Sequence, residues 1–342
     1  MTYKVRRYPS VKAAEKVFEE AKDWPKKGSQ EYDVLLGCDI LFRYIRLKNR
    51  VVVYAIRNKN DELMAIMPVR PMTNGSIQIA GSFERLDFAD FLYNPKAEKE
   101  EVCKFFYEYC RDELKAKCFD TRFVEEASPT FIAAKKFKGF TDIKTWENVN
   151  INIAYKDYDE YFATLSKHAK QNLRTAYNRA ERDEKKIVLV CYSGDTKTLK
   201  KNAKARKDIE ACMKLYTKRQ LKTYVEERAL TYTFRTRMFH YLSVSAKTNK
   251  NGFFAILKLN GEVAAFMQGF YDPFDKEYEI PRLAMNDEMK FYSPGMILVA
   301  EVIKKYIGDK GVTHLNLLRG NEPYKFAMGG EVYTTKEFKI DF

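Results

Sequence analysis

The sequence predicts an α/β protein with mixed sheets, built from two domains in tandem. The chain has 342 residues, which is enough for about two domains. Hydrophobic residues make up 45% of it, so each half can bury a core. Each half also shows the same order of elements, strand–turn–strand–strand–helix–strand, although few residues are identical between the two halves.

The N-terminal domain is expected over residues 1–150. Its strands are short apolar runs bounded by turn residues. Its long helix has glutamates early and lysines late, which matches the helix dipole. The expected elements are an amphipathic helix at 11–24, a strand pair at 51–58 and 63–71 joined by the turn KNDE, a third strand at 76–82, the long helix at 96–118 and a last strand at 119–126.

The C-terminal domain is expected over residues 151–342, and its sheet core repeats the pattern. A strand pair at 252–260 and 262–272, joined at a Gly-Glu turn, is followed by a third strand at 277–285, a helix at 296–307 and a fourth strand at 313–320. In both domains the strand pair should be antiparallel. Each strand–helix–strand crossover should be parallel and right-handed.

A helical region, roughly 157–248, is expected to bridge the two sheet cores. Its first helix spans 159–186 and places small and apolar residues on one face at helical spacing. An adjoining stripe carries polar and basic side chains, at Lys167, Lys170, Arg174 and Asn178. This stripe is either a solvated face or a surface that meets an anionic substrate or partner.

The charge balance favours anionic partners. Lys and Arg total 61 and Asp and Glu total 47, a net charge of +14. Nucleic acid, an anionic membrane surface, an acidic carrier protein and phosphorylated small molecules all suit that sign. The six cysteines form no CxxC pair and suggest neither a zinc site nor a disulfide framework. With no leader-like start and no apolar run of about 18 residues, we expect a soluble cytoplasmic protein.

One stretch combines features of a ligand site. Ser-Pro-Gly at 293–295 offers an N-cap, a first helical proline and a glycine that lets a ligand approach the amides. The strand after this helix ends in Arg319, and Tyr324 and Lys325 follow it. Ligands of open α/β sheets lie beyond the carboxyl ends of the strands, and a parallel crossover would bring both ends together. The stretch therefore predicts an anionic-cofactor site, with an ordinary capped helix as the alternative.

Four motifs in order carry a resemblance to a known family. They are KQNLR at 170–174, GEVAAF at 261–266, SPG at 293–295 and RGNEPYK at 319–325. Over about residues 155–333 the chain resembles the bacterial GNAT-superfamily acetyltransferases associated with cellulose and exopolysaccharide biosynthesis. Lys170 departs from the family pattern, in which an arginine is common. The N-terminal half resembles, in its order of elements, the paired GNAT-like domains of the related Fem peptidyltransferases.

The resemblance implies tandem GNAT-like domains and acyl transfer from a thioester, an acyl-CoA such as acetyl-CoA or an acylated carrier protein. The acceptor would be an amine or hydroxyl of a sugar or a lipid or cell-envelope precursor. The donor would lie between the strands at 277–285 and 313–320, with no metal involved. The implied catalytic residues are Tyr324 as general acid and Glu322 and Asp287 as candidate bases. The implied donor-binding residues are Ser293, Gly295, Met296, Arg319 and Gly320. The implied substrate-binding residues are Arg174, Lys170 and Lys325.

Two other functions fit the same sequence. A Fem-like transferase would take its acyl group from an aminoacyl-tRNA, which the charge and the tandem layout allow. A nucleic-acid or membrane-surface binding protein could also use a GNAT scaffold without catalysis.

Overall fold

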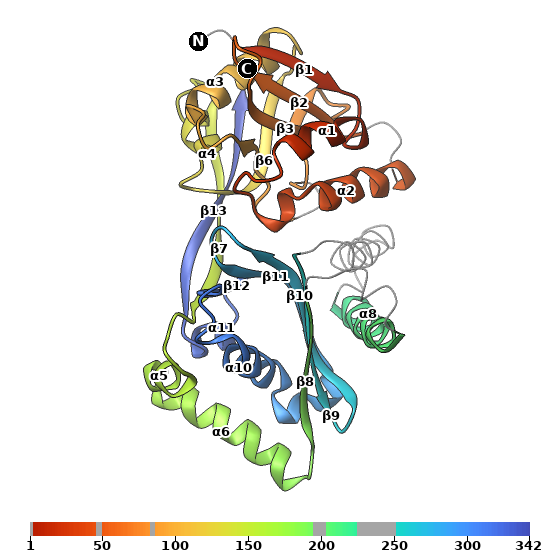
Figure 1. Cartoon of the computed structure of the whole chain (residues 1–342), viewed down its shortest axis with the longest axis vertical. Coiled ribbons are helices and arrows are strands. Elements are labelled where there is room, and N and C mark those ends of the chain that lie inside the picture. Colours follow the sequence, from red (N-terminus) through yellow and green to blue (C-terminus); the bar gives the residue numbers. More distant parts are fainter. Residues whose placement is uncertain (1–2, 46–49, 83–85, 194–202, 224–250) are drawn as a thin grey trace. The chain divides into compact units, whose positions relative to one another are not determined.

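The computed structural model describes residues 3–45, 50–82, 86–193, 203–223 and 251–342 (Figure 1). The chain divides into two compact units. Unit 1 comprises Met1–Glu147 and Thr334–Phe342, and unit 2 comprises Asn148–Tyr333. The last strand residues therefore belong to unit 1, whereas the sequence-based boundaries assign them to the second domain.

Unit 1 contains the elements expected for a strand–strand–strand–helix–strand unit, and several more. Its strands are β1 (Lys4–Tyr8), β2 (Val52–Arg57), β3 (Leu63–Pro71), β4 (Ser76–Ile79), β5 (Leu92–Tyr93) and β6 (Cys118–Glu125). Its helices are η1 (Lys12–Ala14), α1 (Glu15–Glu20), η2 (Gly28–Gln30), α2 (Tyr32–Ile45), α3 (Lys99–Asp112) and α4 (Pro129–Ala134). Two long strands have residues in both units, β7 (Phe140–Asn152) and β13 (Gly330–Asp341).

The pairing in unit 1 confirms the predicted pattern. β2 and β3 are antiparallel, and β4 and β6, which flank α3 in the sequence, are parallel. α3 begins with Glu100 and Glu101 and has Arg111 in its last turn, as its dipole favours. Its apolar face packs into one core with the strands through Val102, Cys103, Phe106, Tyr107 and Cys110.

Unit 2 contains the second copy of the pattern. Its strands besides β7 and β13 are β8 (Ile187–Ser193), β9 (Gly252–Leu259), β10 (Glu262–Asp272), β11 (Glu277–Met285) and β12 (His314–Arg319). Its helices are α5 (Tyr158–Thr164), α6 (Lys167–Arg182), α8 (Ala203–Thr223), η3 (Asp287–Tyr292), α10 (Pro294–Tyr306) and α11 (Pro323–Ala327). β9 and β10 are antiparallel and β11 and β12 are parallel, as predicted.

The expected helical region 157–248 is wrong in its middle. Residues 187–193 form β8, which pairs antiparallel with β9. The run IVLVCYS is apolar and rich in β-branched residues, which is typical of a strand rather than of an amphipathic helix. α5 and α6 precede this strand and α8 follows it, whereas residues 224–248 lie outside the described residues.

The strands form a large mixed sheet. Their hydrogen-bonded order is β1-β2-β3-β4-β6-β13-β7-β12-β11-β10-β9-β8, with β5 beside β3. The fold class predicted from the sequence, an α/β protein with a mixed sheet, is confirmed.

Helices cover both faces of the strands in unit 2. α10 packs on β8 to β11 and on α6, and these elements share the main apolar core of the unit. α8 contacts β10 and β11 on the opposite face, where Cys212 and Tyr216 pack against Phe266 and Ala284. Figure 1 shows α10 and α6 on one side of these strands and α8 on the other. The chain crossover from β11 through α10 to β12 is therefore held in the middle of a layered unit.

Candidate active site

The central feature of unit 2 is the point at which two parallel strands part. β11 and β12 pair at three positions, Glu277 with His314, Tyr278 with Leu315 and Glu279 with Asn316. Beyond these pairs β11 continues to Met285 and β12 to Arg319 without pairing with each other. We call this divergence the splay. An extended ligand can bind strand-like between two such backbones.

Irregular pairing on the outer side of each strand accompanies the splay. The register of β10 against β11 shifts between Gln268 and Phe270. A side chain at Gly269 would clash with the carbonyl of Glu279, so only glycine fits this close approach. On the other side, the register of β12 against β7 shifts between Asn316 and Leu318. Bulges bend the strand that carries them, so the two irregularities turn the strands apart at the same level of the sheet.

The start of α10 lies beside the splayed half of β11. Ser293 occupies the N-cap position, as predicted, but in a left-handed conformation (φ 49°, ψ 51°) and without a side-chain cap. A Cβ atom added at Gly295 would lie 4.0 Å from Leu283 Cδ2 and 4.0 Å from Met285 Sδ. Packing within the protein therefore does not require glycine at this position.

The backbone amides at this helix start are already engaged in part. Pro294 has no N–H, and the amide of Met296 donates to the carbonyl of Ser293 at 3.0 Å. In the first turn of α10, the amide of Gly295 has no acceptor in the described part of the chain. Gly295 itself is buried. The expected anion site at Gly295 and Met296 thus offers fewer amides than an open helix terminus provides.

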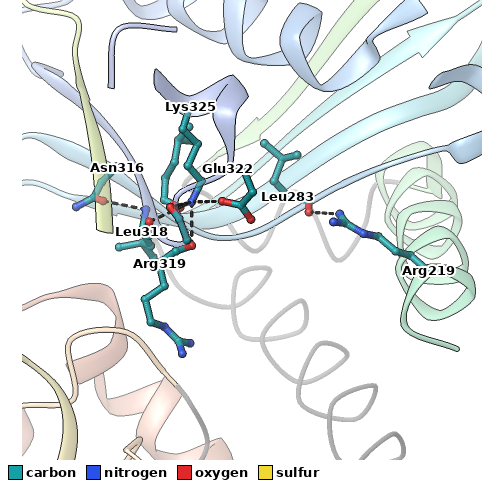
Figure 2. Close-up of polar contacts among 9 residues, drawn as sticks. Arg219, Leu283, Asn316, Leu318, Arg319, Glu322 and Lys325 are labelled. Atoms are coloured by element: carbon teal, nitrogen blue, oxygen red, sulfur yellow. Dashed lines mark hydrogen bonds and ion pairs between the residues drawn. The ribbon is translucent and has the colours of Figure 1, made fainter. Parts of the chain in front are cut away.

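The loop after β12 is built around a buried ammonium group. Lys325 is 3% exposed, and its Nζ donates to four consecutive carbonyls (Figure 2). Those of Leu317 and Leu318 lie at 3.0 and 3.1 Å, and those of Arg319 and Gly320 at 2.8 and 3.0 Å. The ammonium expected from the sequence to bind substrate is therefore used by the protein itself.

Tyr324, the expected general acid, sits on α11 and packs against the main core of unit 2. It is half-buried, and its hydroxyl has no hydrogen-bond partner among the described residues. Burial raises the pKa of Tyr324, the charge of Glu322 raises it further, and Arg219 lowers it. The hydroxyl therefore stays protonated at neutral pH and has a proton to donate.

Arg219 of α8 is a site residue that sequence reasoning missed. Its Nη1 donates to the carbonyl of Leu283 at 3.0 Å, on the splayed half of β11 (Figure 2). Its charge also acts on Tyr324. In the sequence, α8 resembles other basic amphipathic segments of the chain, and no motif indicates a role for Arg219.

Comparison with known proteins identifies the fold. Residues 167–326 match the family model described as an acetyltransferase (GNAT) domain. A tandem GNAT protein from the clavulanic acid biosynthesis pathway superposes with a TM-score of 0.51 at 10% identity, over 99% of this chain and 98% of that one. The fold is of the GNAT type.

Other known structures share this fold along nearly their whole length. FemX superposes with a TM-score of 0.57 at 11% identity, over 100% of this chain and 98% of that one. The lysylphosphatidylglycerol synthetase of Bacillus licheniformis gives 0.52 at 13% identity, over 95% and 91%. No curated protein matches the chain in sequence. Identities this low establish the fold and leave the substrates open.

The remaining predicted residues of the GNAT unit do not gather at the splay. Lys170 and Arg174 lie on α6 with their charged ends 5.9 and 5.5 Å from the ring centre of Phe162, and Lys170 donates to the carbonyl of Ala163. Asp287 is exposed on η3, and Glu322 is exposed and pairs with Lys325 at 3.1 Å. Of the residues predicted from the sequence, Arg319, Gly320, Glu322, Tyr324 and Lys325 lie in one segment after β12, and Ser293, Gly295 and Met296 lie together at the start of α10.

A buried acidic cluster at the base of the splay was also missed. Asp272, Glu277 and Glu279 are 2 to 4% exposed. One carboxylate oxygen from each of the three lies within 4.8 Å of the oxygens from the other two. Asn150 and Asn316 donate to Glu277 at 3.2 and 3.3 Å. The alternating Glu-Tyr-Glu at the start of β11 was the available signal, because residues two apart share a face of a strand. These carboxylates join Asp287 and Glu322 as candidate bases of the GNAT unit.

Within the described ranges, no helix combines the length and the apolar character needed to cross a bilayer.

Proposed function

We propose that unit 2 is an acyltransferase that moves an acyl group from a thioester to an amine or hydroxyl. The donor is an acyl-CoA, such as acetyl-CoA, or an acylated carrier protein. The observation that carries this proposal is the splay of β11 and β12, with Tyr324 on the helix α11 that follows β12. The GNAT domain match over residues 167–326 supports it.

The reaction needs few protein groups. The acceptor nitrogen or oxygen attacks the thioester carbonyl carbon, the carbon–sulfur bond breaks, and the sulfur leaves as a thiolate. The acceptor loses a proton, and the leaving thiolate gains one. Tyr324 is suited to donate to the sulfur because its hydroxyl is protonated and has no competing partner in the described structure. A carboxylate of the buried acidic cluster, Asp287 or Glu322 would receive the acceptor's proton.

Anionic parts of donor and acceptor have candidate partners on several elements. In this proposal the Gly295 amide, the Ser293 hydroxyl and Arg319 meet the phosphates of the donor. Lys170 and Arg174 would hold an anionic acceptor, such as a sugar phosphate or a lipid or cell-envelope precursor, or an acidic carrier protein. The guanidinium forks suit bidentate contact with phosphate or carboxylate. An acyl-CoA donor would place the reaction in the cytoplasm.

A second candidate is transfer from an aminoacyl ester, as carried by aminoacyl-tRNA. Two observations favour it. The amide of Met296 already donates to the carbonyl of Ser293, so the start of α10 offers fewer free amides for a pyrophosphate than an acyl-CoA donor would need. The raised pKa of Tyr324 also suits an alcohol leaving group, because an alkoxide is a stronger base than a thiolate and takes a proton from a weak acid more readily.

Thermal-shift measurements separate these candidates. A donor at about 100 times its dissociation constant should stabilise the protein by about 2.7 kcal/mol. Stabilisation by acetyl-CoA or a longer acyl-CoA, absent with adenosine alone, would support the thioester donor. Absence of any shift with acyl-CoA and acylated carrier protein would overturn it. Binding of aminoacyl-tRNA with a steep salt dependence would then favour the ester donor, because several phosphate contacts release several counterions.

A further inference from the structure

We propose that Lys325 is a positioning residue whose ammonium fills a cation site formed by the backbone of Leu317 to Gly320, and that this site fixes the loop which places Tyr324 and Arg319 at the splay. The proposal rests on the proposed function, because it assigns that loop to acyl transfer.

The geometry is that of a coordination shell rather than of separate hydrogen bonds. An ammonium group has three N–H donors, yet five oxygens surround Nζ of Lys325, four carbonyls at 2.8 to 3.1 Å and Glu322 Oε2 at 3.1 Å. A small cation such as ammonium can be surrounded by carbonyl oxygens in this way, with its N–H groups donating to them. The side chain is 3% exposed, so its charge depends on these oxygens in place of water.

The backbone adopts an unusual shape to present these oxygens. Successive carbonyls of an extended strand point in opposite directions, so four in a row cannot face one atom. Here Leu318 has φ 53° and Gly320 has φ 106°, which turn the chain so that the oxygens converge. Leucine rarely adopts this conformation, so the loop needs a compensating interaction, and the buried ammonium supplies it.

The same loop carries the groups that face the proposed reaction. Arg319 contributes one of the four carbonyls, and Tyr324 directly precedes Lys325. The amide of Leu318 donates to Asn316 Oδ1 at 3.0 Å, and Asn316 also donates to Glu277 of the buried acidic cluster. Figure 2 shows Lys325 on one side of this loop and the Arg319 guanidinium on the other. Lys325 therefore acts on the site through its neighbours and not by touching substrate.

The test is chemical rescue of Lys325→Ala. The matched control is Lys336→Ala in unit 1, since Lys336 is also mostly buried, with a side chain 12% exposed, but binds side-chain oxygens of Asp142 and Thr145. Both variants are assayed with the donor found by thermal shift, at a temperature where near-ultraviolet circular dichroism shows them folded. Ammonium or methylammonium is added, and tetramethylammonium at equal concentration controls for ionic strength.

We expect Lys325→Ala to lose roughly 10²-fold in kcat, because Tyr324 would be misplaced, with the KM for donor changed by less than about threefold. Ammonium should restore part of the kcat and raise the melting temperature of this variant in a saturable way. Tetramethylammonium should do neither, and Lys336→Ala should respond to neither salt.

Other outcomes overturn the proposal. A folded Lys325→Ala variant with wild-type kcat would show that the loop needs no cation. Where Lys325→Ala does not fold, Lys325→Met fills the volume without the charge, and full kcat in that variant has the same meaning. If ammonium restores neither folding nor rate in any variant, Lys325 is purely structural. The melting-temperature rescue needs no acyl donor, so it tests the cation site even if the proposed function fails.

Discussion

The hydroxyl of Tyr324 has no hydrogen-bond partner in the described structure, unlike the hydroxyls of Tyr161 and Tyr271 in the same core. Tyr161 donates to the carbonyl of Met328, and Tyr271 donates to that of Gly311. A hydroxyl that bonds to no protein group can donate its proton to a ligand. This is the residue-level observation behind its assignment as proton donor.

Tyr324→Phe should lower turnover by roughly 10²-fold while the melting temperature and donor affinity barely change, because the ring and its packing remain. Steady-state kinetics and thermal melts measure the two effects. Tyr271→Phe is the matched control, since it removes a hydroxyl that bonds only within the protein. Full turnover in the Tyr324 variant would assign that side chain to packing.

Asp90 in unit 1 predicts a pH dependence of stability that is independent of catalysis. The carboxylate of Asp90 accepts hydrogen bonds from the hydroxyls of Ser128 and Thr130 and from the backbone amide of Phe91. Burial nevertheless raises the pKa of Asp90 to about 6. The folded state therefore binds this proton more tightly than the unfolded chain does, whose aspartates titrate near pH 3.9. Its contribution to stability is complete below about pH 4 and is lost as the pH rises through about 6.

Asp90→Asn should remove this dependence. Between pH 4 and pH 7 the unfolding free energy of the wild type should fall relative to that of the variant, by about 3 kcal/mol at most. Urea unfolding across this pH range measures it. Parallel pH profiles for the two proteins would show that the carboxyl titrates in its ordinary range.

At the scale of elements, the start of α10 provides the sharpest test of where the donor binds. Gly295 has neither a left-handed conformation nor a close packing neighbour that requires glycine. Gly295→Val should therefore fold with a melting temperature within a few degrees of the wild type and lose acyl-CoA binding, because the added methyl groups would occupy the approach to the amide. Thermal shift with acetyl-CoA measures this. Unchanged binding would place the donor phosphates elsewhere.

Sequence reasoning found most elements that frame the splay but not the splay itself. The apolar run of β12 and the Ser-Pro-Gly start of α10 are local signals, and each element appears where it was expected. The resemblance supplied the two strands between which a donor would lie. The bend of β11 depends on the packing of Gly269 against Glu279, two residues on different strands, and no local pattern reveals it.

Side-chain roles were harder to predict than strands, for a similar reason. Lys325 looks like a substrate ligand in the motif RGNEPYK, but the loop folds over its ammonium. Arg219 reaches Leu283 from a helix 64 residues away in sequence. β8 was missed because its short apolar run lies within a stretch that was interpreted as helical throughout, although its β-branched residues favour a strand.

Across the whole molecule, the two units use the same strand pattern differently. In unit 1 the parallel pair β4 and β6 also ends early, after Ser76 with Cys118 and Ile77 with Phe119. There the gap is bridged, because the amide of Arg122 donates to the Oγ of buried Ser82 at 2.8 Å. Gln78 bonds to Asp120 across the same strands. The equivalent of the splay in unit 1 is closed by the protein's own side chains.

We therefore expect one donor per chain. Isothermal titration with an acyl-CoA should give a stoichiometry near one, and Gly295→Val should abolish all of the heat. Ser82→Ala removes the bridging oxygen in unit 1 and should leave the stoichiometry unchanged. Two equivalents bound by the wild type, or one retained by Gly295→Val, would show that unit 1 also takes a donor.

The passage of β7 and β13 through both units has a consequence for how the protein is made. Residues 148–333 form unit 2 without interruption, whereas unit 1 is completed only by 334–342, whose strand pairs with β6 from Thr335 to Asp341. On the ribosome the edge of β6 in the first unit therefore stays uncovered until residues 335–341 have emerged, after the whole of the second unit. Domains usually fold in the order of their synthesis, and an open strand edge invites aggregation. In this chain the nascent first unit must stay protected until the unit encoded after it has emerged.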